Sequence, residues 1–395
     1  MTSASLDPLL ASREIVVYCG SGGVGKTTVA AATGLAAAVE LGGSVLVLTI
    51  DPAKRLADAL GLEGIGNVER RVPDDALRAA GLEPRGELFA AMLDTKASWD
   101  DLVLRHAPDE ETAYTVLNNS LYQNITARFV QSHDYIAMER LYDLHTNGRY
   151  DLIVVDTPPT RNAIDFLEAP TRMAEFFGGR LLRWLTMPYR LGGRRGARFV
   201  NFASRPFYQL ADRVLGSQFL QEIAEFFLSF QSMYDGFVAR AEAVERLLHD
   251  RRTTFAVVTT LEGAPLREAE FFAHELTKRR FPFGAMVLNR VLPDFLTSPD
   301  GQASAAAIAD HADGLAKGLA SLDEARLDDP DAVARVLRTM AATFRDYGVV
   351  ATRERELRGE LGRVPDVVAS VPAFPDDVHD LAGLARIGRA LLANP

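Results

Sequence analysis

The stretch that decides the fold is Gly20-Ser21-Gly22-Gly23-Val24-Gly25-Lys26-Thr27-Thr28, which matches the phosphate-loop pattern G-x-x-x-x-G-K-[ST] at every fixed position. An apolar run at residues 14–19 precedes it and an Ala-rich run at residues 27–41 follows it, which predicts a strand, a glycine loop and a helix. Glycines let backbone N–H groups turn toward a phosphate, and a helix N-terminus adds a favourable field. We therefore predict a nucleotide-phosphate site at this loop.

Each part of the loop has an expected role. Lys26 would reach the β- and γ-phosphates, Thr27 would hold Mg²⁺ through its hydroxyl, and Thr28 would contact the α-phosphate. The backbone of the other positions would form the cradle, and these are Gly20, Ser21, Gly22, Gly23, Val24 and Gly25.

Further apolar runs of strand length alternate with helix-prone segments. They lie at residues 44–50, 88–94, 151–156, 254–260, 284–289 and 367–371. Continuous apolar strands linked by helices predict an α/β fold with a doubly wound, mostly parallel sheet covered on both faces. Ligands of such sheets bind at the carboxyl ends of the strands. Polar residues stand at four of these ends, namely Asp51, Asp156, Thr260 and Asn289.

Long helical insertions separate some of these strands. We expect a single domain over residues 1–395, with a nucleotide core at approximately 13–96, 150–170 and 252–395 and a helical subdomain at approximately 97–149 and 171–251. One helical face of the second insertion is largely aromatic, and its residues are Leu215, Phe219, Ile223, Phe226, Phe230, Tyr234 and Phe237. Such a stripe normally faces a core, although it could instead line a groove for a partner.

Two segments near the C-terminus are less distinctive. Residues Ser298 to Ser321 are rich in Ala, Gly, Ser and Asp, and this composition predicts a mobile loop with a weak helix. Leu381 to Leu392 is amphipathic, and docking as a last helix is favoured over membrane binding.

Bulk composition narrows the class of protein. The net charge of −10 disfavours a general nucleic-acid surface. Cys19 is the only cysteine, which excludes an intrachain disulfide and a CxxC metal site, and the seven histidines lack metal-ligand spacing. The sequence shows no signal peptide and no apolar run long enough to span a bilayer. We therefore expect a cytoplasmic protein, with contact at a membrane surface left open.

Two aspartates could turn a nucleotide site into a hydrolase. Asp51, in Thr49-Ile50-Asp51-Pro52-Ala53, could orient the attacking water, and Asp156, in Asp156-Thr157-Pro158-Pro159-Thr160, could bind Mg²⁺. Each could instead be a helix N-cap or a turn residue, since Asp is common before Pro. The phosphate loop upstream favours the catalytic interpretation.

Together, these motifs resemble a known family. The order G-x-G-G-V-G-K-T-T, T-I-D-P-A-x-x-L-x-D-A-L-G and Y-D-x-I-V-V-D-T-P-P-T is similar to that of the ArsA and tail-anchored-protein-targeting ATPases. These belong to the dimeric phosphate-loop ATPases that include ParA, MinD and the nitrogenase iron protein. The resemblance is specific in the nucleotide core and loose in the helical regions.

The resemblance implies roles for individual residues. Asp51 matches the first-switch carboxylate that positions water, Asp156 matches the second-switch acid, and Asn289 matches the asparagine that reads adenine. Pro372 and its neighbours would pack on the base. Asn289 could alternatively be a turn residue at the end of a strand.

Three departures from the family pattern matter. Ser21 stands where relatives carry a lysine that reaches the partner's nucleotide. Arg161 is one candidate substitute, although a solvated surface arginine is the slightly favoured interpretation of that residue. The cysteines that bind arsenite in arsenical pump ATPases are missing, and so is the zinc-binding CxxC motif of eukaryotic targeting factors.

The resemblance implies an ATPase that uses ATP and Mg²⁺ and couples hydrolysis to movement of the helical subdomain for client or partner handling. The alternative is a nucleotide-gated binding protein or chaperone whose hydrolysis is weak or depends on a partner. A ParA-like DNA switch is less favoured, and no nucleic acid is expected. Partners would be a second copy or a related ATPase, and a protein client or a membrane surface is left open.

Overall fold

The computed structural model describes most of the chain. The described residues are 5–50, 55–62, 64–120, 122–123, 130–157, 168–169, 171–172, 233, 236–321, 329–361, 365 and 367–393. Asp51, Arg161 and the stripe residues from Leu215 to Tyr234 therefore lie outside the described residues.

An eight-stranded sheet in the order β3-β4-β2-β5-β1-β6-β7-β8 forms the centre of the molecule. Every neighbouring pair is parallel except β3 and β4. The strands are β1 Ile15–Cys19, β2 Gly43–Thr49, β3 Arg70–Arg71, β4 Gly86–Met92, β5 Leu152–Asp156, β6 Thr253–Thr259, β7 Phe283–Val291 and β8 Val367–Pro372. The predicted α/β fold is confirmed, and β1 lies inside the sheet between β5 and β6.

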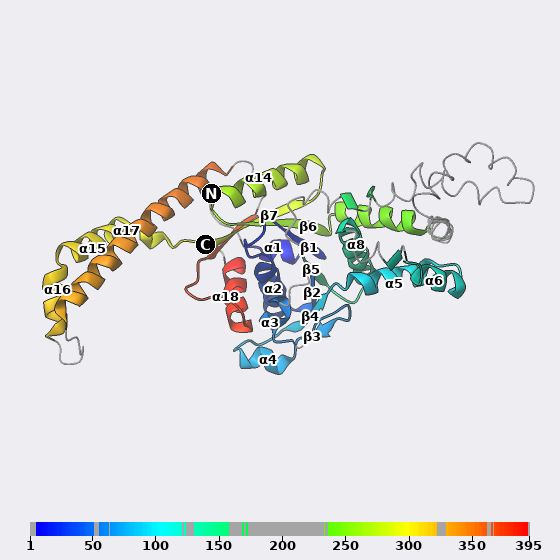
Figure 1. Ribbon diagram of the computed structural model, residues 1–395, viewed down its shortest axis with the longest axis horizontal. Helices are drawn as coiled ribbons and strands as arrows, with labels where there is room; N and C mark the ends of the chain where they lie inside the picture. Colours follow the sequence, from blue (N-terminus) through cyan, green and yellow to red (C-terminus); the bar gives the residue numbers. More distant parts are fainter. Residues whose placement is uncertain are drawn as a thin grey trace, which may run out of the picture.

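Helices cover both faces of the sheet (Figure 1). Before β5 they are α1 Asp7–Leu10, α2 Lys26–Ala36, α3 Arg55–Leu60, α4 Asp74–Ala79, α5 Thr95–His106, α6 Glu110–Leu117 and α8 Val130–Thr146. After β6 they are α14 Gly263–Lys278, α15 Pro299–Asp310, α16 Ala312–Ala320, α17 Pro330–Glu360 and α18 Leu381–Leu392. A π-helical turn, Ala37–Leu41, extends α2, and a 3-10 turn, Asp294–Thr297, precedes α15.

Alternation along β1 shows how the two faces are divided. Val16 and Tyr18 pack into the core that α2 and α18 cover, whereas Ile15 and Val17 pack into the core shared with α5 and α8. Because both faces are buried, the central positions of the inner parallel strands are apolar on both sides of the sheet. Among the described residues, no helix is both long enough and apolar enough to cross a lipid bilayer.

The predicted docking of the last helix is confirmed. A Cβ on Gly388 of α18 would lie 2.8 Å from the Cβ of Ala36 in α2, so the two helices approach closely at this glycine. The side chain of Asp380 caps α18 by accepting from the Gly383 N–H at 2.7 Å.

Beyond β4, the helical region has an aromatic core. The ring centroids of Trp99 and Tyr135 are 5.9 Å apart, and those of Trp99 and Phe237 are 6.5 Å apart. Phe237, the one stripe residue that the structure describes, is buried in this core, as the core interpretation predicts. Arg240 bonds Glu139 at 2.5 Å and also pairs with Asp143, which ties residues 236–249 to α8.

The prediction of a mobile loop at Ser298–Ser321 was wrong. The segment forms α15 and α16, which pack on the 31-residue helix α17 and build an arm that projects from the sheet (Figure 1). The Ser298 side chain caps α15 by accepting from the Gly301 N–H at 3.1 Å, and Pro299 fits the first helical turn. Here the Ser-Pro pair starts a helix.

Candidate nucleotide site

The predicted order of strand, glycine loop and helix is confirmed, because the loop joins the end of β1 to the start of α2. Gly23 and Gly25 have φ values of +82° and +91°, in the left-handed region that favours glycine. A Cβ on Gly20 would lie 2.2 Å from the Val258 carbonyl oxygen of β6. The backbone can therefore wrap tightly here only because these positions carry no side chain.

Lys26 lies inside the loop. Its side chain is buried, and its Nζ donates to the Ser21 carbonyl oxygen at 2.8 Å. Thr27 and Thr28 follow in the first turn of α2 and are half-buried. The Ser21 hydroxyl is buried and has no hydrogen-bond partner in the part of the chain that the structure describes.

Asp156 stands next to the loop at the carboxyl edge of the sheet. It ends β5 and is in register with Tyr18 of β1 on one side and with Thr49 of β2 on the other. Its side chain is fully buried, and Oδ2 accepts from the Thr49 hydroxyl at 2.9 Å. The next residue, Thr157, donates its hydroxyl to the Tyr18 carbonyl at 2.8 Å. The two sequence motifs therefore meet at one place.

Asn289 is brought to the same loop from the other side. Its Nδ2 donates to the Val24 carbonyl at 2.7 Å, and its Oδ1 accepts from the Arg290 N–H at 3.0 Å. Arg290 has a φ of +59°, and the pairing of β7 with β8 changes register between Leu288 and Val291. This local irregularity surrounds Asn289. Its contact with the loop was not predicted, because no local pattern signals a bond between residues so far apart in the chain.

Other predicted residues lie around this edge. Pro372 ends β8 opposite Val291 and is exposed. Thr260 directly follows β6; its hydroxyl is buried and has no partner among the described residues. Cys19 ends β1, and burial raises the pKa of its thiol to about 12, although the Thr157 hydroxyl and the Lys26 charge oppose that rise.

The loop and its neighbours fit a Mg²⁺-nucleotide. Glycine-lined backbone, a buried lysine and the start of α2 suit phosphates. Within the described ranges, no group of three or more His, Cys, Asp or Glu side chains is arranged so that it could hold a metal ion by itself. A Mg²⁺ bound with a nucleotide needs only one or two carboxylates, because phosphates and water complete its shell. Thr27 and Asp156 therefore suit that role.

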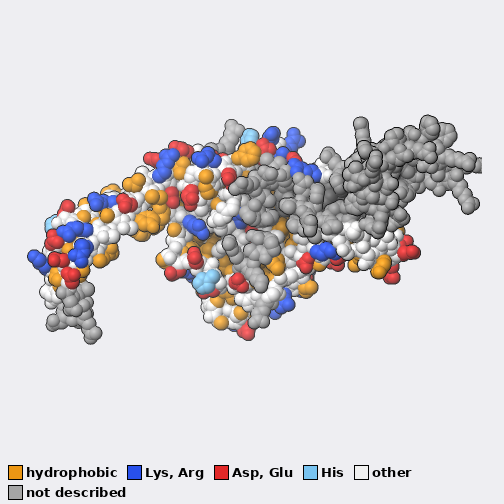
Figure 2. Space-filling view, in the orientation of Figure 1, with side chains coloured by type: hydrophobic (Ala, Val, Ile, Leu, Met, Phe, Trp, Pro, Cys, Tyr) orange, Lys and Arg blue, Asp and Glu red, His pale blue; other side chains and the backbone are white. Residues whose placement is uncertain are grey.

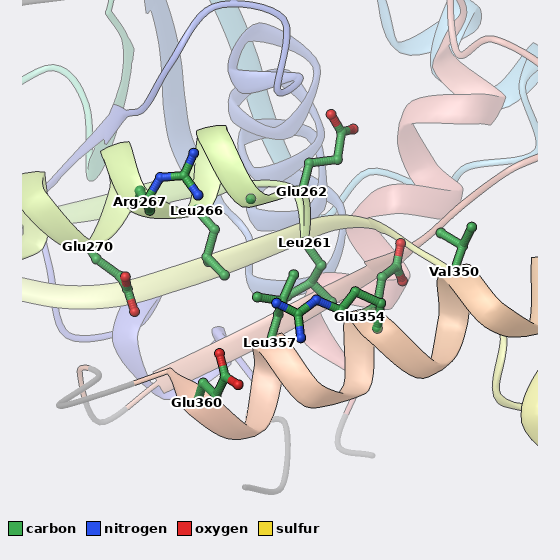
Figure 3. A pocket seen from close by; sticks show the side chains of 11 residues that line it. Leu261, Glu262, Leu266, Arg267, Glu270, Val350, Glu354, Leu357 and Glu360 are labelled. Carbon is green, nitrogen blue, oxygen red and sulfur yellow. The ribbon is translucent and has the colours of Figure 1, made fainter.

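A cavity of about 510 Å³ opens between α14 and α17, close to the ends of β6 and β7 (Figure 3). Leu261, Leu266 and Leu357 line it, and Glu354 lies at its wall. Glu354 Oε2 accepts from the Leu292 N–H at 3.0 Å, just after β7. Burial raises the pKa of the Glu354 carboxyl, and the nearby negative charge of Glu262 raises it further. The hydrogen bond from the Leu292 N–H acts in the opposite direction and lowers this pKa.

The chain is similar to several ATPases of known family. It is 25% identical to "ATPase ASNA1 homolog 1" of Paramecium tetraurelia over 70% of this chain and 74% of that protein. It is 23% identical to "ATPase BagA" of Mycobacterium tuberculosis over 97% of this chain and 93% of that protein. It is 23% identical to "ATPase GET3" of Podospora anserina over 73% of this chain and 76% of that protein.

The family model described as anion-transporting ATPase matches residues 13–306, which include the phosphate loop, Asp156 and Asn289. This match extends over more than half of the sequence. The chain therefore belongs to the anion-transporting ATPase (ArsA) family.

Proposed function

We propose that this protein binds Mg²⁺-ATP at the loop Gly20–Thr28 and hydrolyses it. The observation that carries the proposal is the loop itself: left-handed glycines enclose the buried Lys26 ammonium, and Asp156 lies on the adjacent strand. Membership of a family of ATPases supports the same activity.

Each residue around the loop would have a separate role in holding the nucleotide or its Mg²⁺. Lys26 would hold the β- and γ-phosphates, Thr28 would bond the α-phosphate, and Thr27 and Asp156 would hold Mg²⁺, whose charge offsets that of the phosphates. To reach the phosphates, the Lys26 ammonium would exchange the Ser21 carbonyl for phosphate oxygens. Asp51 would position the attacking water, by the family resemblance.

Asn289 and Pro372 would hold the adenine. The Asn289 amide retains a second N–H and a second lone pair beyond its bonds to Val24 and Arg290. One side chain could thus fix the loop backbone and contact the base.

The expected outputs are client or partner handling by the helical subdomain and pairing of two chains, either two copies or a copy and a related ATPase. Support comes from membership of the family and from the relatives, one of which is named GET3. Another relative, of Aquifex aeolicus, is named as a putative arsenical pump-driving ATPase. Arsenite is not the ligand we propose here, because Cys19 is the one thiol of the chain and is buried.

A second candidate function is nucleotide-gated binding with slow or partner-dependent turnover. Ser21 favours it, because this position offers a neutral hydroxyl, where relatives carry a lysine toward the partner's nucleotide. Binding and turnover should therefore be measured separately.

The first experiment compares Lys26→Ala with Lys317→Ala, an exposed lysine on α16 that serves as the matched control. We expect Lys26→Ala to weaken binding of a fluorescent ATP analogue by about tenfold or more, because a charge-assisted bond contributes about 1.5–3 kcal/mol. Lys317→Ala should bind like the parent. Equal binding by both variants would contradict the proposed site.

The second experiment measures phosphate release from ATP with Mg²⁺ over a range of protein concentrations. Release that disappears in Lys26→Ala and Asp51→Asn supports the ATPase. Tight binding without release at every concentration supports the gated binding protein instead.

A further inference from the structure

One face of the α17 arm is apolar and exposed. Val336, Met340, Tyr347 and Val350 are 57%, 62%, 51% and 50% exposed. Figure 2 shows hydrophobic side chains interspersed with charged ones along this arm. Exposed apolar side chains mark an interaction surface when they form one contiguous patch, whereas single exposed apolar side chains are ordinary.

These side chains form a regular seam. Val336, Met340, Thr343, Tyr347 and Val350 follow one another at steps of four, three, four and three residues. An average step of 3.5 residues places them in a line along the helix, as in the contact seam of a coiled coil. The seam is distinct from the face that packs on α15 and α16, whose small buried residues are Ala334, Ala341, Gly348 and Ala351. At its C-terminal end, Val350 also lines the cavity between α14 and α17 (Figure 3).

The seam is complementary to itself when two copies run antiparallel. With the midpoint between Met340 and Thr343, Tyr347 of each copy lies across from Val336 of the other, and Met340 lies across from Thr343. Each layer then pairs a large side chain with a smaller one, which is what close packing requires. A parallel pairing would place Tyr347 on Tyr347 and Thr343 on Thr343.

Charge also favours a second copy. The whole chain has a net charge of −10, yet α17 holds six arginines against five aspartates and glutamates. Two such arms can approach without the repulsion that acidic surfaces of this chain would produce. Beside the seam, Asp346 would lie across from Thr339, so no like charges face each other there.

We propose that α17 pairs antiparallel with α17 of a second copy of this chain, through the seam from Val336 to Val350. Such a contact is isologous, because each copy presents the same residues to the other. It does not depend on the nucleotide site, and it can be tested without measuring turnover.

The test uses disulfide cross-linking of the full chain. The native Cys19 is buried and its pKa is raised to about 12, so it gives little background. In a variant with Val336→Cys and Tyr347→Cys, the two cysteines of one helix are about 16 Å apart and beyond the reach of about 7 Å for a disulfide. A linked product must therefore join two chains.

We expect this double variant to form a covalent dimer under mild oxidation, while Val336→Cys and Tyr347→Cys alone link poorly. The matched control carries Val336→Cys with Arg345→Cys, which lies on another face of α17. A double variant that links no better than this control overturns the proposal. So does efficient linking by Val336→Cys alone, which would indicate a parallel pair or random collision.

Sedimentation velocity at micromolar concentrations gives an independent readout. We expect the native chain to dimerise and Met340→Glu to weaken dimerisation by about tenfold or more, because a charge would be buried in the seam. Val349→Glu, at a more exposed position off the seam, should behave like the native chain. Circular dichroism checks that both variants are folded. A native monomer, or a dimer unaffected by Met340→Glu, overturns the proposal and leaves the seam to another protein's helix or to none.

Discussion

Gly25→Ala should disturb the phosphate loop through two separate effects. The φ of +91° at this position costs a residue with a Cβ about 1–2 kcal/mol. The new methyl group would also lie 2.3 Å from Nδ2 of Asn289, so that amide must leave the Val24 carbonyl. A neutral hydrogen bond contributes about 1 kcal/mol net, which brings the expected loss of stability to about 2–3 kcal/mol.

The two effects can be separated with Asn289→Ala, which removes the clash and the bond but leaves the backbone cost. In the double variant, Gly25→Ala should cost only about 1–2 kcal/mol more than Asn289→Ala alone. Urea unfolding measures these differences, and binding of a fluorescent ATP analogue reports the loop itself. Strict additivity of the two changes, or a Gly25→Ala variant as stable as the parent, would refute the close contact between the loop and Asn289.

Three further changes have defined outcomes. Arg240→Ala leaves Glu139 buried without its partner, and a broken buried pair costs about 3–5 kcal/mol. Burial raises the pKa of the Glu139 carboxyl and the Arg240 charge opposes this rise, so removing Arg240 should raise the folded-state pKa further. A protonated Glu139 is neutral and needs no cationic partner. The stability that Arg240→Ala loses relative to the parent, measured in urea, should therefore be smaller near pH 4, below the unfolded pKa of about 4.3, than near pH 7. Burial raises the pKa of the Cys19 thiol to about 12, so this thiol should react with a thiol reagent at pH 8 only as fast as the protein unfolds. Rapid labelling of the native chain would contradict this and show that the end of β1 is accessible. Gly388→Val should force α18 away from Ala36, reduce the free energy of unfolding by about 1–3 kcal/mol and expose the C-terminus to limited proteolysis. Gly314→Val, at an open position of α16, should leave the C-terminus as resistant to proteolysis as in the parent.

The sheet could be predicted well because its strands are buried on both faces. In runs such as residues 44–50 and 151–156 the central positions, 45–48 and 152–155, are all apolar, and the structure places these runs in β2 and β5 within a residue or two. The two-residue strand β3 was not predicted, since Arg70 and Arg71 carry no strand pattern and pair only through β4.

The arm was missed for a tertiary reason. α15 and α16 are poor in large apolar residues, and they are held by small side chains such as Ala312 and Ala316 packed near Ala334 of α17. Close packing of alanines leaves little trace in hydrophobic periodicity. In the same way, motifs brought Lys26 and Asp156 together in the prediction, whereas the bond from Asn289 to the loop became visible only in the folded chain.

The attachment of α17 to β7 also has a mechanical consequence. The Glu354 carboxylate accepts a hydrogen bond from the Leu292 N–H. Leu292 lies three residues after Asn289, whose side chain donates to the Val24 carbonyl of the phosphate loop. The helix extends about 36 Å from Glu354 to Pro330. A rotation of about 5° at this base would move the far end by about 3 Å, so a small displacement at the phosphate loop that turned the base of α17 would be several times larger at the tip of the arm.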